Sequence, residues 1–433
     1  MRLIRLLKND LAKEAVDWVE KDIITQAQAE QICQQYHVDY HQAKNHSLGY
    51  SVLMGLGYLF IGLSLVTLLG ANWEEIPRAL RMWGLIALTL TTQAVALRLY
   101  LRGSDAAIGL FLLGNLFYGA SIILIAQIYH LGEHMPDGVF WWALGCLPAA
   151  VLLRSTLLML QTLVLALIWF FLEAGMGFYP LLFPLFVLSA ALVLWRGKQS
   201  LSLFFVMLLS LLFWFEVTLA ELWREGLYYD FVAEQVMVSV VLFLWAYAIS
   251  GWLSTKTSVK ALDYAAVTAL WSLRFGVLFL IIMSFADPWE RLLSANWEHL
   301  PSLLLIAGVL SIATILLAWR CGPRGSVLIF LAAFWLALLS VLLLRNDEHA
   351  LIFQVGTNLL LMGTGVWLIV RGINNRISHY FFLGVATILV TALLRYVDLI
   401  GDYVGGALLF LVFAALLLGA ARYWKKSHQE VSR

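Results

Sequence analysis

The sequence predicts an all-α polytopic integral membrane protein of about 14 transmembrane helices (12–14), preceded by a short cytoplasmic N-terminal helical hairpin. Three observations predict this fold class. Of the 433 residues, 62% are hydrophobic and 13% are charged, against roughly 45–50% and about 25% in soluble domains. From Gly49 onward, apolar runs alternate with short polar breaks, and basic residues gather in every second break.

Three domains follow from this pattern: a cytoplasmic hairpin at 1–48, a transmembrane bundle at 49–423 and a cytoplasmic basic tail at 424–433. In the hairpin, Leu11, Ala15 and Val19 recur at helical spacing and form one apolar face. Thr25 and Gln28 have the spacing of a capping box, which predicts that a second helix begins there.

The first apolar run, 49–71, is long enough to cross a hydrocarbon core of ~30 Å. Thirteen further runs follow, of which those between residues 138 and 195 are the most closely spaced, with breaks of only one or two residues. The predicted spans are 49–71, 82–101, 107–128, 138–153, 155–172, 175–195, 201–220, 231–253, 265–286, 302–319, 326–344, 351–370, 379–397 and 405–423.

The distribution of the 28 Lys and Arg residues predicts the orientation. With the N-terminus in the cytoplasm, most of them fall in cytoplasmic segments, as the positive-inside rule requires. Two lie within spans, and the five on the outer side are Arg78, Arg81, Arg224, Arg291 and Arg345. We therefore expect both the N- and the C-terminus in the cytoplasm.

Polar residues within the spans are the candidates for a substrate or ion pathway. A charge at mid-bilayer costs at least roughly 2.5 kcal/mol, so it usually faces protein or water. Arg274 lies deep in the span 265–286. Glu216 and Glu234 lie on two successive spans, each about one turn from the outer end. In one interpretation, these two glutamates approach each other or Arg274. The uncharged candidates, for which interhelical hydrogen bonding is the simpler interpretation, are Asn115, Gln93 and Asn358.

A second group of polar residues lies in the outer third and suits a vestibule that opens outward. One sequence there occurs twice, as Ala71–Pro77 (ANWEEIP) and Ala295–Pro301 (ANWEHLP). The two copies are eight spans apart, which predicts a parallel repeat, although Trp and Pro are common in such loops. The candidates of this outer-face group are Asn72, Trp73, Gln127, Tyr129, His130, Arg395, Asp398 and Asp402.

No recognised catalytic motif is present. His130 to His134 match H-x-x-E-H, but Gly132 and the following Met135-Pro136-Asp137-Gly138 indicate a turn rather than a metal-binding helix. The glycines near Gly55 follow no strand, and Cys33, Cys146 and Cys321 form no metal-ligand spacing. We expect no catalytic residue of a soluble-enzyme type, no metal and no cofactor, and the net charge of +1 gives no reason to expect nucleic acid.

Two segments resemble a known family. The polar N-terminal hairpin is followed by Gly70–Pro77 (GANWEEIP), and the third span closes with Gln127–Leu131 (QIYHL). Over roughly the first 150 residues the chain resembles the bacterial predicted membrane proteins with an N-terminal domain of unknown function (DUF2157 type). The later half resembles them only in its multi-pass character and in Gly401-Asp402-Tyr403. The resemblance implies a bacterial inner-membrane location and assigns no functional role to any residue.

Three functions remain open. The first is a transporter or flippase-like protein for a small polar solute or lipid head group, with Arg274 facing the anion and Glu216 and Glu234 binding a proton or cation. The second is a non-transporting scaffold or sensor that recruits a protein partner through residues 1–45. The third is an intramembrane enzyme that acts on a lipid-linked substrate through Glu216, Glu234 or His130.

Overall fold

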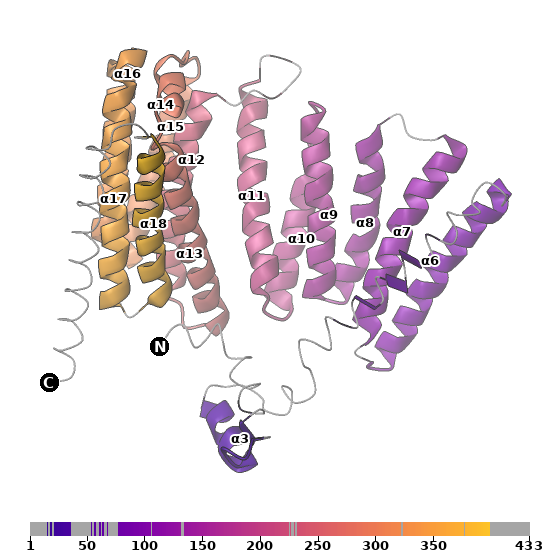
Figure 1. The fold of residues 1–433 in the computed structure, drawn as a ribbon. Helices are drawn as coiled ribbons and strands as arrows, with labels where there is room; N and C mark the ends of the chain where they lie inside the picture. The colour runs from indigo at the N-terminus through magenta and orange to yellow at the C-terminus, as the bar shows by residue number, and fades with distance from the viewer. Residues whose placement is uncertain are drawn as a thin grey trace. The chain divides into compact units, whose positions relative to one another are not determined.

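The structure is a computed structural model (Figure 1), and the part it describes is entirely helical. Residues 77–398 are described except for 105, 131–133, 225, 227–228, 230–231, 322–323 and 376, together with 21–35 and scattered residues between 15 and 67. Eleven of the described helices are long and apolar enough to cross a membrane. This confirms the predicted all-helical, polytopic membrane protein.

The twelve predicted spans from 82–101 to 379–397 each correspond to one helix. The predicted span 49–71 is described only at scattered residues, and 405–423 and 424–433 lie outside the described part of the chain. The helices are α6 (Arg78–Leu101), α7 (Ala106–Tyr129), α8 (Met135–Leu152), α9 (Thr156–Gly175), α10 (Phe183–Arg196), α11 (Leu201–Leu222), α12 (Ala233–Leu253), α13 (Val259–Ile282), α15 (Leu300–Cys321), α16 (Arg324–Leu343), α17 (Ala350–Asn374) and α18 (Ser378–Asp398).

The chain divides into two compact units at residues 231 and 232. The first unit contains α6 to α11, and the second contains α12 to α18. Within the first unit, consecutive helices pack against each other in a row of antiparallel neighbours (Figure 1). Within the second, α12 packs on α13, α15 and α16, and α17 packs on α18.

Helix α10 is shorter than the predicted span 175–195. It begins at Phe183 and has 14 residues, which makes it about 21 Å long. Gly177 takes a left-handed φ of 84°, and Pro180 and Pro184 lack the amide hydrogen that a longer helix would need. The residues between α9 and α10 are therefore irregular backbone, which within a membrane occurs where protein or a water-filled cavity surrounds it.

Two glycines bring α7 and α8 close together. A Cβ atom on Gly119 would overlap the indole of Trp142, and one on Gly145 would overlap the ring of Tyr118. In the second unit, a Cβ atom on Gly384 would lie 2.6 Å from the carbonyl oxygen of Gly365. Small residues at such crossings permit the close backbone approach typical of membrane helices.

A short helix, α14 (Ala286–Leu293), was not predicted, because the apolar run was assigned to a single span ending at 286. The chain instead leaves α13 at Ile282 and turns. In α14, Trp289 is buried and its ring stacks on Phe353 of α17 at 5.0 Å, whereas Asp287 is exposed. An apolar face on one side and charge on the other fit a helix that lies along the end of a bundle.

Of the predicted N-terminal hairpin, the structure describes the second helix and only Ala15, Trp18 and Val19 of the first. Helix α3 (Gln26–Gln35) begins after Thr25, whose backbone N–H donates to Gln28 Oε1 at 2.9 Å. The N–H of Gln28 donates back to Thr25 Oγ1 at 3.4 Å, so the capping box is present. Ala15, Ala29 and Cys33 are fully buried, and Trp18, Val19 and Ile24 pack around them.

Candidate functional site

An open cavity of about 1180 Å³ lies between α6, α7 and α8 of the first unit. Most of its wall is apolar, formed by residues such as Ile86, Leu90 and Ile122. Toward the end where α7 stops and α8 begins, which we call the α7–α8 end, the lining becomes polar. The polar residues there are Gln127, His130, His134 and Asp137. We refer to this space as the amphipathic cavity.

The sequence itself explains why the lining changes at that end. His130 closes α7 with a left-handed φ of 53°, and its Nδ1 lies 2.9 Å from the carbonyl oxygen of Gln127. Pro136 then lies in the first turn of α8, where a missing amide hydrogen costs nothing. His130 and His134 thus lie at the two ends of the connection between α7 and α8, where Gly132 and Pro136 predicted a turn. Both histidines line the cavity.

One of these histidines is held by a residue that the sequence did not identify as a site residue. His134 Nε2 lies 3.1 Å from Glu173 Oε2 at the end of α9, and the indole Nε1 of Trp169 donates to the same oxygen at 3.1 Å. Both side chains of this contact are half-buried. Glu173 thereby fixes the ring of His134 at the polar end of the cavity.

Deeper between the helices, polar side chains bond to each other. Thr89 and Ser121 share a hydrogen bond of 3.0 Å at the cavity wall. Beyond them, Gln93 Nε2 donates to Asn115 Oδ1 at 3.0 Å. Gln93 and Asn115 were both predicted, and the structure joins them across α6 and α7 in the way that interhelical hydrogen bonding would require.

At the same end of the unit, α11 carries further charge. Arg224 lies 3.2 Å from Glu221 and donates to the carbonyl oxygen of Gly177 at 2.6 Å. Tyr229 donates to Glu221 at 3.0 Å, and burial together with this hydrogen bond raises the pKa of Tyr229. The predicted residue Glu216 lies half-buried on α11 and belongs to a different unit from Glu234.

In the second unit, Glu234 is fully buried in the first turn of α12. Its Oε1 accepts the backbone N–H of His299 at 3.0 Å, directly before α15 begins. Its Oε2 has no hydrogen-bond partner among the described residues. Two helix N-termini therefore surround this carboxylate and compensate part of its burial, and it does not pair with Arg274.

Asn358 of α17 holds the connection between α13 and α14. Its Nδ2 donates to the carbonyl oxygens of Ser284 at 3.1 Å and Gln354 at 2.8 Å. Its buried Oδ1 has no partner within the described ranges. The contacts with Ser284 and Gln354 give Asn358 a packing role.

The remaining predicted residues are dispersed. Arg274 is exposed on α13, and its guanidinium lies 4.9 Å from the centre of the Trp271 ring. The guanidinium of Arg395 lies 4.9 Å from the centre of the Phe285 ring. Tyr129 is the last residue of α7 and is 43% exposed. Asn72, Trp73, Asp402 and the side chain of Asp398 lie outside the described part of the chain.

The second copy of the repeated sequence begins after α14 and ends in the first turn of α15, and its Trp297 is buried. Of the first copy only Pro77 is described, directly before α6. No group of three or more His, Cys, Asp or Glu side chains that could hold a metal ion occurs among the described residues.

Comparison with known proteins supports the predicted resemblance over one part of the chain. Residues 16–159 match the family described as Predicted membrane protein (DUF2157). No curated protein and no solved structure matches the chain. The matched segment contains every residue that lines the amphipathic cavity, so this cavity belongs to the family-like part of the protein.

Proposed function

We propose that the protein is a transporter or flippase-like protein that takes up an amphiphilic molecule through the amphipathic cavity. The observation that carries this proposal is the change of the lining along the cavity, from an apolar wall to a polar α7–α8 end. A lipid-like molecule has the same division into an apolar chain and a polar head group.

The size of the cavity favours a lipid over a small polar solute. Pockets for drug-sized ligands have volumes of roughly 300–1,000 Å³, and this cavity reaches about 1180 Å³. Leu90, Ile122 and Ile125 offer no hydrogen bonds to a solute, whereas an acyl chain needs none. The polar α7–α8 end lies on the side that the distribution of Lys and Arg predicts to be outer.

The polar residues favour a particular kind of head group. Gln127, His130, His134 and Asp137 supply both hydrogen-bond donors and acceptors. Neither Lys nor Arg is among the described residues that line the cavity, so a phosphate alone would find no cationic partner in this part of the wall. A head group with amine or hydroxyl groups therefore fits best, with Asp137 facing an amine and the histidines facing hydroxyl groups.

Arg274 has a separate place in this proposal. Its side chain is exposed on α13, eight residues before the helix ends. A guanidinium facing lipid hydrocarbon would cost at least roughly 2.5 kcal/mol, so this face of α13 is expected to meet water or protein. We propose that Arg274 meets the phosphate of a passing lipid on such a water-exposed path. Glu216 in the first unit and Glu234 in the second are proposed separately, each as a proton or cation site within its own unit.

Native mass spectrometry of the purified protein with added phosphatidylethanolamine tests the proposal. Ala126 lines the cavity, so Ala126→Trp fills it and is expected to remove most of the bound lipid. Leu116→Trp is the matched control, because Leu116 is exposed on the same helix and lies outside the lining. Equal lipid occupancy in both variants would contradict the proposal.

The scaffold function remains the second candidate because the hairpin has a buried cluster of its own at Ala15, Ala29 and Cys33. Deletion of residues 1–45 distinguishes the two functions. A scaffold would lose its activity while the spans stay inserted, whereas a transporter would retain phosphatidylethanolamine binding.

A further inference from the structure

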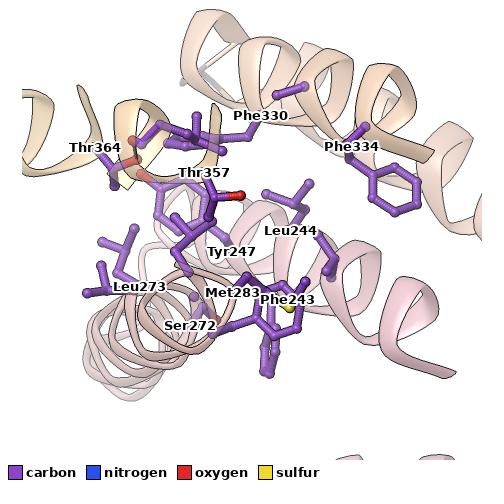
Figure 2. A pocket seen from close by; sticks show the side chains of 18 of the residues that line it. Phe243, Leu244, Tyr247, Ser272, Leu273, Met283, Phe330, Phe334, Thr357 and Thr364 are labelled. Carbon is purple, nitrogen blue, oxygen red and sulfur yellow. Dashed lines mark hydrogen bonds between the residues drawn. The ribbon is translucent and has the colours of Figure 1, made fainter. Parts of the chain in front are cut away.

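A second cavity lies inside the second unit, among α12, α13, α16 and α17, and has a volume of about 180 Å³. Figure 2 shows side chains from these helices around it, including Tyr247, Leu273, Phe330 and Thr364. Aromatic rings form much of the wall, and we call this space the aromatic cavity. It does not depend on the amphipathic cavity or on the function proposed for it.

Two hydroxyl groups in the wall have no partner among the described residues. They belong to Tyr247 and Ser272, which line the cavity from α12 and α13. The hydroxyls of Thr357 and Thr364 differ, because each donates at 2.8 Å to a carbonyl oxygen of its own helix. Tyr247 and Ser272 are therefore the wall residues whose O–H groups remain able to donate to a ligand.

Among the described residues that line the cavity, none carries a carboxylate, an ammonium or a guanidinium group. Among the described cations, the guanidinium of Arg371 lies 5.9 Å from the centre of the Tyr247 ring and 5.0 Å from the centre of the Trp367 ring. Arg371 itself does not line the cavity. A charged ligand would lose its hydration without gaining an ionic partner, so the occupant is uncharged.

The volume sets the size of the occupant. An apolar cavity of about 150 Å³ in another protein stays dry and binds benzene, so a space of about 180 Å³ accepts one six-membered ring with small substituents. An apolar site with a few polar groups that orient the ligand is the usual form of a small-molecule site. Two O–H donors call for a ring that carries acceptor oxygens.

We propose that the aromatic cavity binds the ring of a lipid-soluble quinone, with Tyr247 and Ser272 donating hydrogen bonds to its carbonyl oxygens. The alkyl tail of such a molecule extends from the site into apolar surroundings. No electron transfer is part of this proposal, which concerns binding alone.

Isothermal titration of the full-length protein in detergent tests the proposal with three probes of equal tail length: decylbenzoquinone, decylbenzene and decanoate. We expect saturable binding of one decylbenzoquinone per protein, binding of decylbenzene at least tenfold weaker, and no binding of decanoate. Equal affinity for decylbenzoquinone and decylbenzene would overturn the role of the hydroxyls.

The cavity offers a matched pair of variants. Gly276 lines it, and a Cβ atom there would meet no atom within 4 Å, so Gly276→Leu fills the space without a clash and is expected to abolish binding. Gly356 has the same open surroundings on the exposed side of α17, so Gly356→Leu should bind as wild type does. Unchanged binding in Gly276→Leu would overturn the site.

Tyr247→Phe retains the ring that faces Arg371 and removes only the hydroxyl, and Ser272→Ala does the same for the second donor. Each is expected to weaken decylbenzoquinone binding about two- to tenfold and to leave decylbenzene binding unchanged. Ala126→Trp in the amphipathic cavity should not affect decylbenzoquinone binding, which separates a failure of this proposal from a failure of the transport proposal.

Discussion

Asn115 Nδ2 donates to Gln161 Oε1 at 2.9 Å, and this bond joins α7 to α9 in the interior of the first unit. Asn115 also accepts from Gln93 Nε2, and its carbonyl oxygen accepts from Trp142 Nε1 at 2.8 Å. One residue of α7 is thus bonded to α6, α8 and α9. With 2% of its surface exposed, Asn115 has little access to solvent as an alternative partner.

We expect Asn115→Leu to destabilise the protein by about 1–2 kcal/mol, because each interhelical hydrogen bond contributes roughly 0.6 kcal/mol and the amides of Gln93 and Gln161 lose their partner. Thermal unfolding in detergent measures the effect. Leu116→Ala changes an exposed neighbour and serves as the control. A variant Asn115→Leu as stable as this control would show that the bonds contribute nothing.

The close contact of α7 with α8 gives a second prediction. Gly119→Ala would press a methyl group into the indole of Trp142 and is expected to cost about 1–3 kcal/mol. Gly138→Ala is the control, since its Cβ atom would meet Ile122 at an ordinary 3.7 Å. The same unfolding measurement should therefore give a lower unfolding temperature for Gly119→Ala than for Gly138→Ala. Equal unfolding temperatures for both variants would contradict the close packing of the two helices.

The spans could be predicted from the sequence because each is a single apolar run, and hydropathy depends on composition alone. The late start of α10 depends on Pro180 and Pro184, whose missing amide hydrogens do not enter a measure of hydropathy. The partner of Asn115 could not be predicted, because Gln161 becomes a neighbour only once α7 and α9 pack together. The lining of both cavities depends on the same packing, and Glu173 became a candidate only through its contact with His134.

Glu234 leads to a third prediction. Its carboxylate accepts the N–H of His299 at the start of α15. Glu234→Gln keeps an acceptor oxygen and loses only the favourable charge at the helix end, about 0.3–1 kcal/mol. Glu234→Leu removes the acceptor as well and is expected to cost about 1–3 kcal/mol.

The order of unfolding temperatures should therefore be wild type, then Glu234→Gln, then Glu234→Leu. Glu298 directly precedes His299 in the sequence, and its side chain is exposed. Glu298→Leu should therefore leave the unfolding temperature unchanged and serves as the control. If Glu234→Gln were as unstable as Glu234→Leu, the charge rather than the hydrogen bond would be the main contribution.

The transport proposal makes a prediction for Arg274. In liposomes, the rate at which a fluorescent phosphatidylethanolamine crosses the bilayer should fall at least tenfold in Arg274→Leu. It should fall less in Arg274→Lys, because Lys keeps the positive charge but lacks the planar guanidinium that can donate two hydrogen bonds to one phosphate. The reconstituted amount of each variant is compared by gel. Wild-type rates in Arg274→Leu would remove Arg274 from the proposed path.

The predicted orientation is tested by cysteine labelling in intact cells. Asp287 on α14 and Lys198 between α10 and α11 are both exposed, and the distribution of basic residues puts the first outside and the second inside. We expect a membrane-impermeant maleimide to label Asp287→Cys and to label Lys198→Cys only after the membrane is opened. Replacement of Cys33, Cys146 and Cys321 by Ser removes background labelling. The reverse pattern would place the α7–α8 end, and with it the polar part of the amphipathic cavity, on the cytoplasmic side, so that a lipid head group would enter from the inner leaflet.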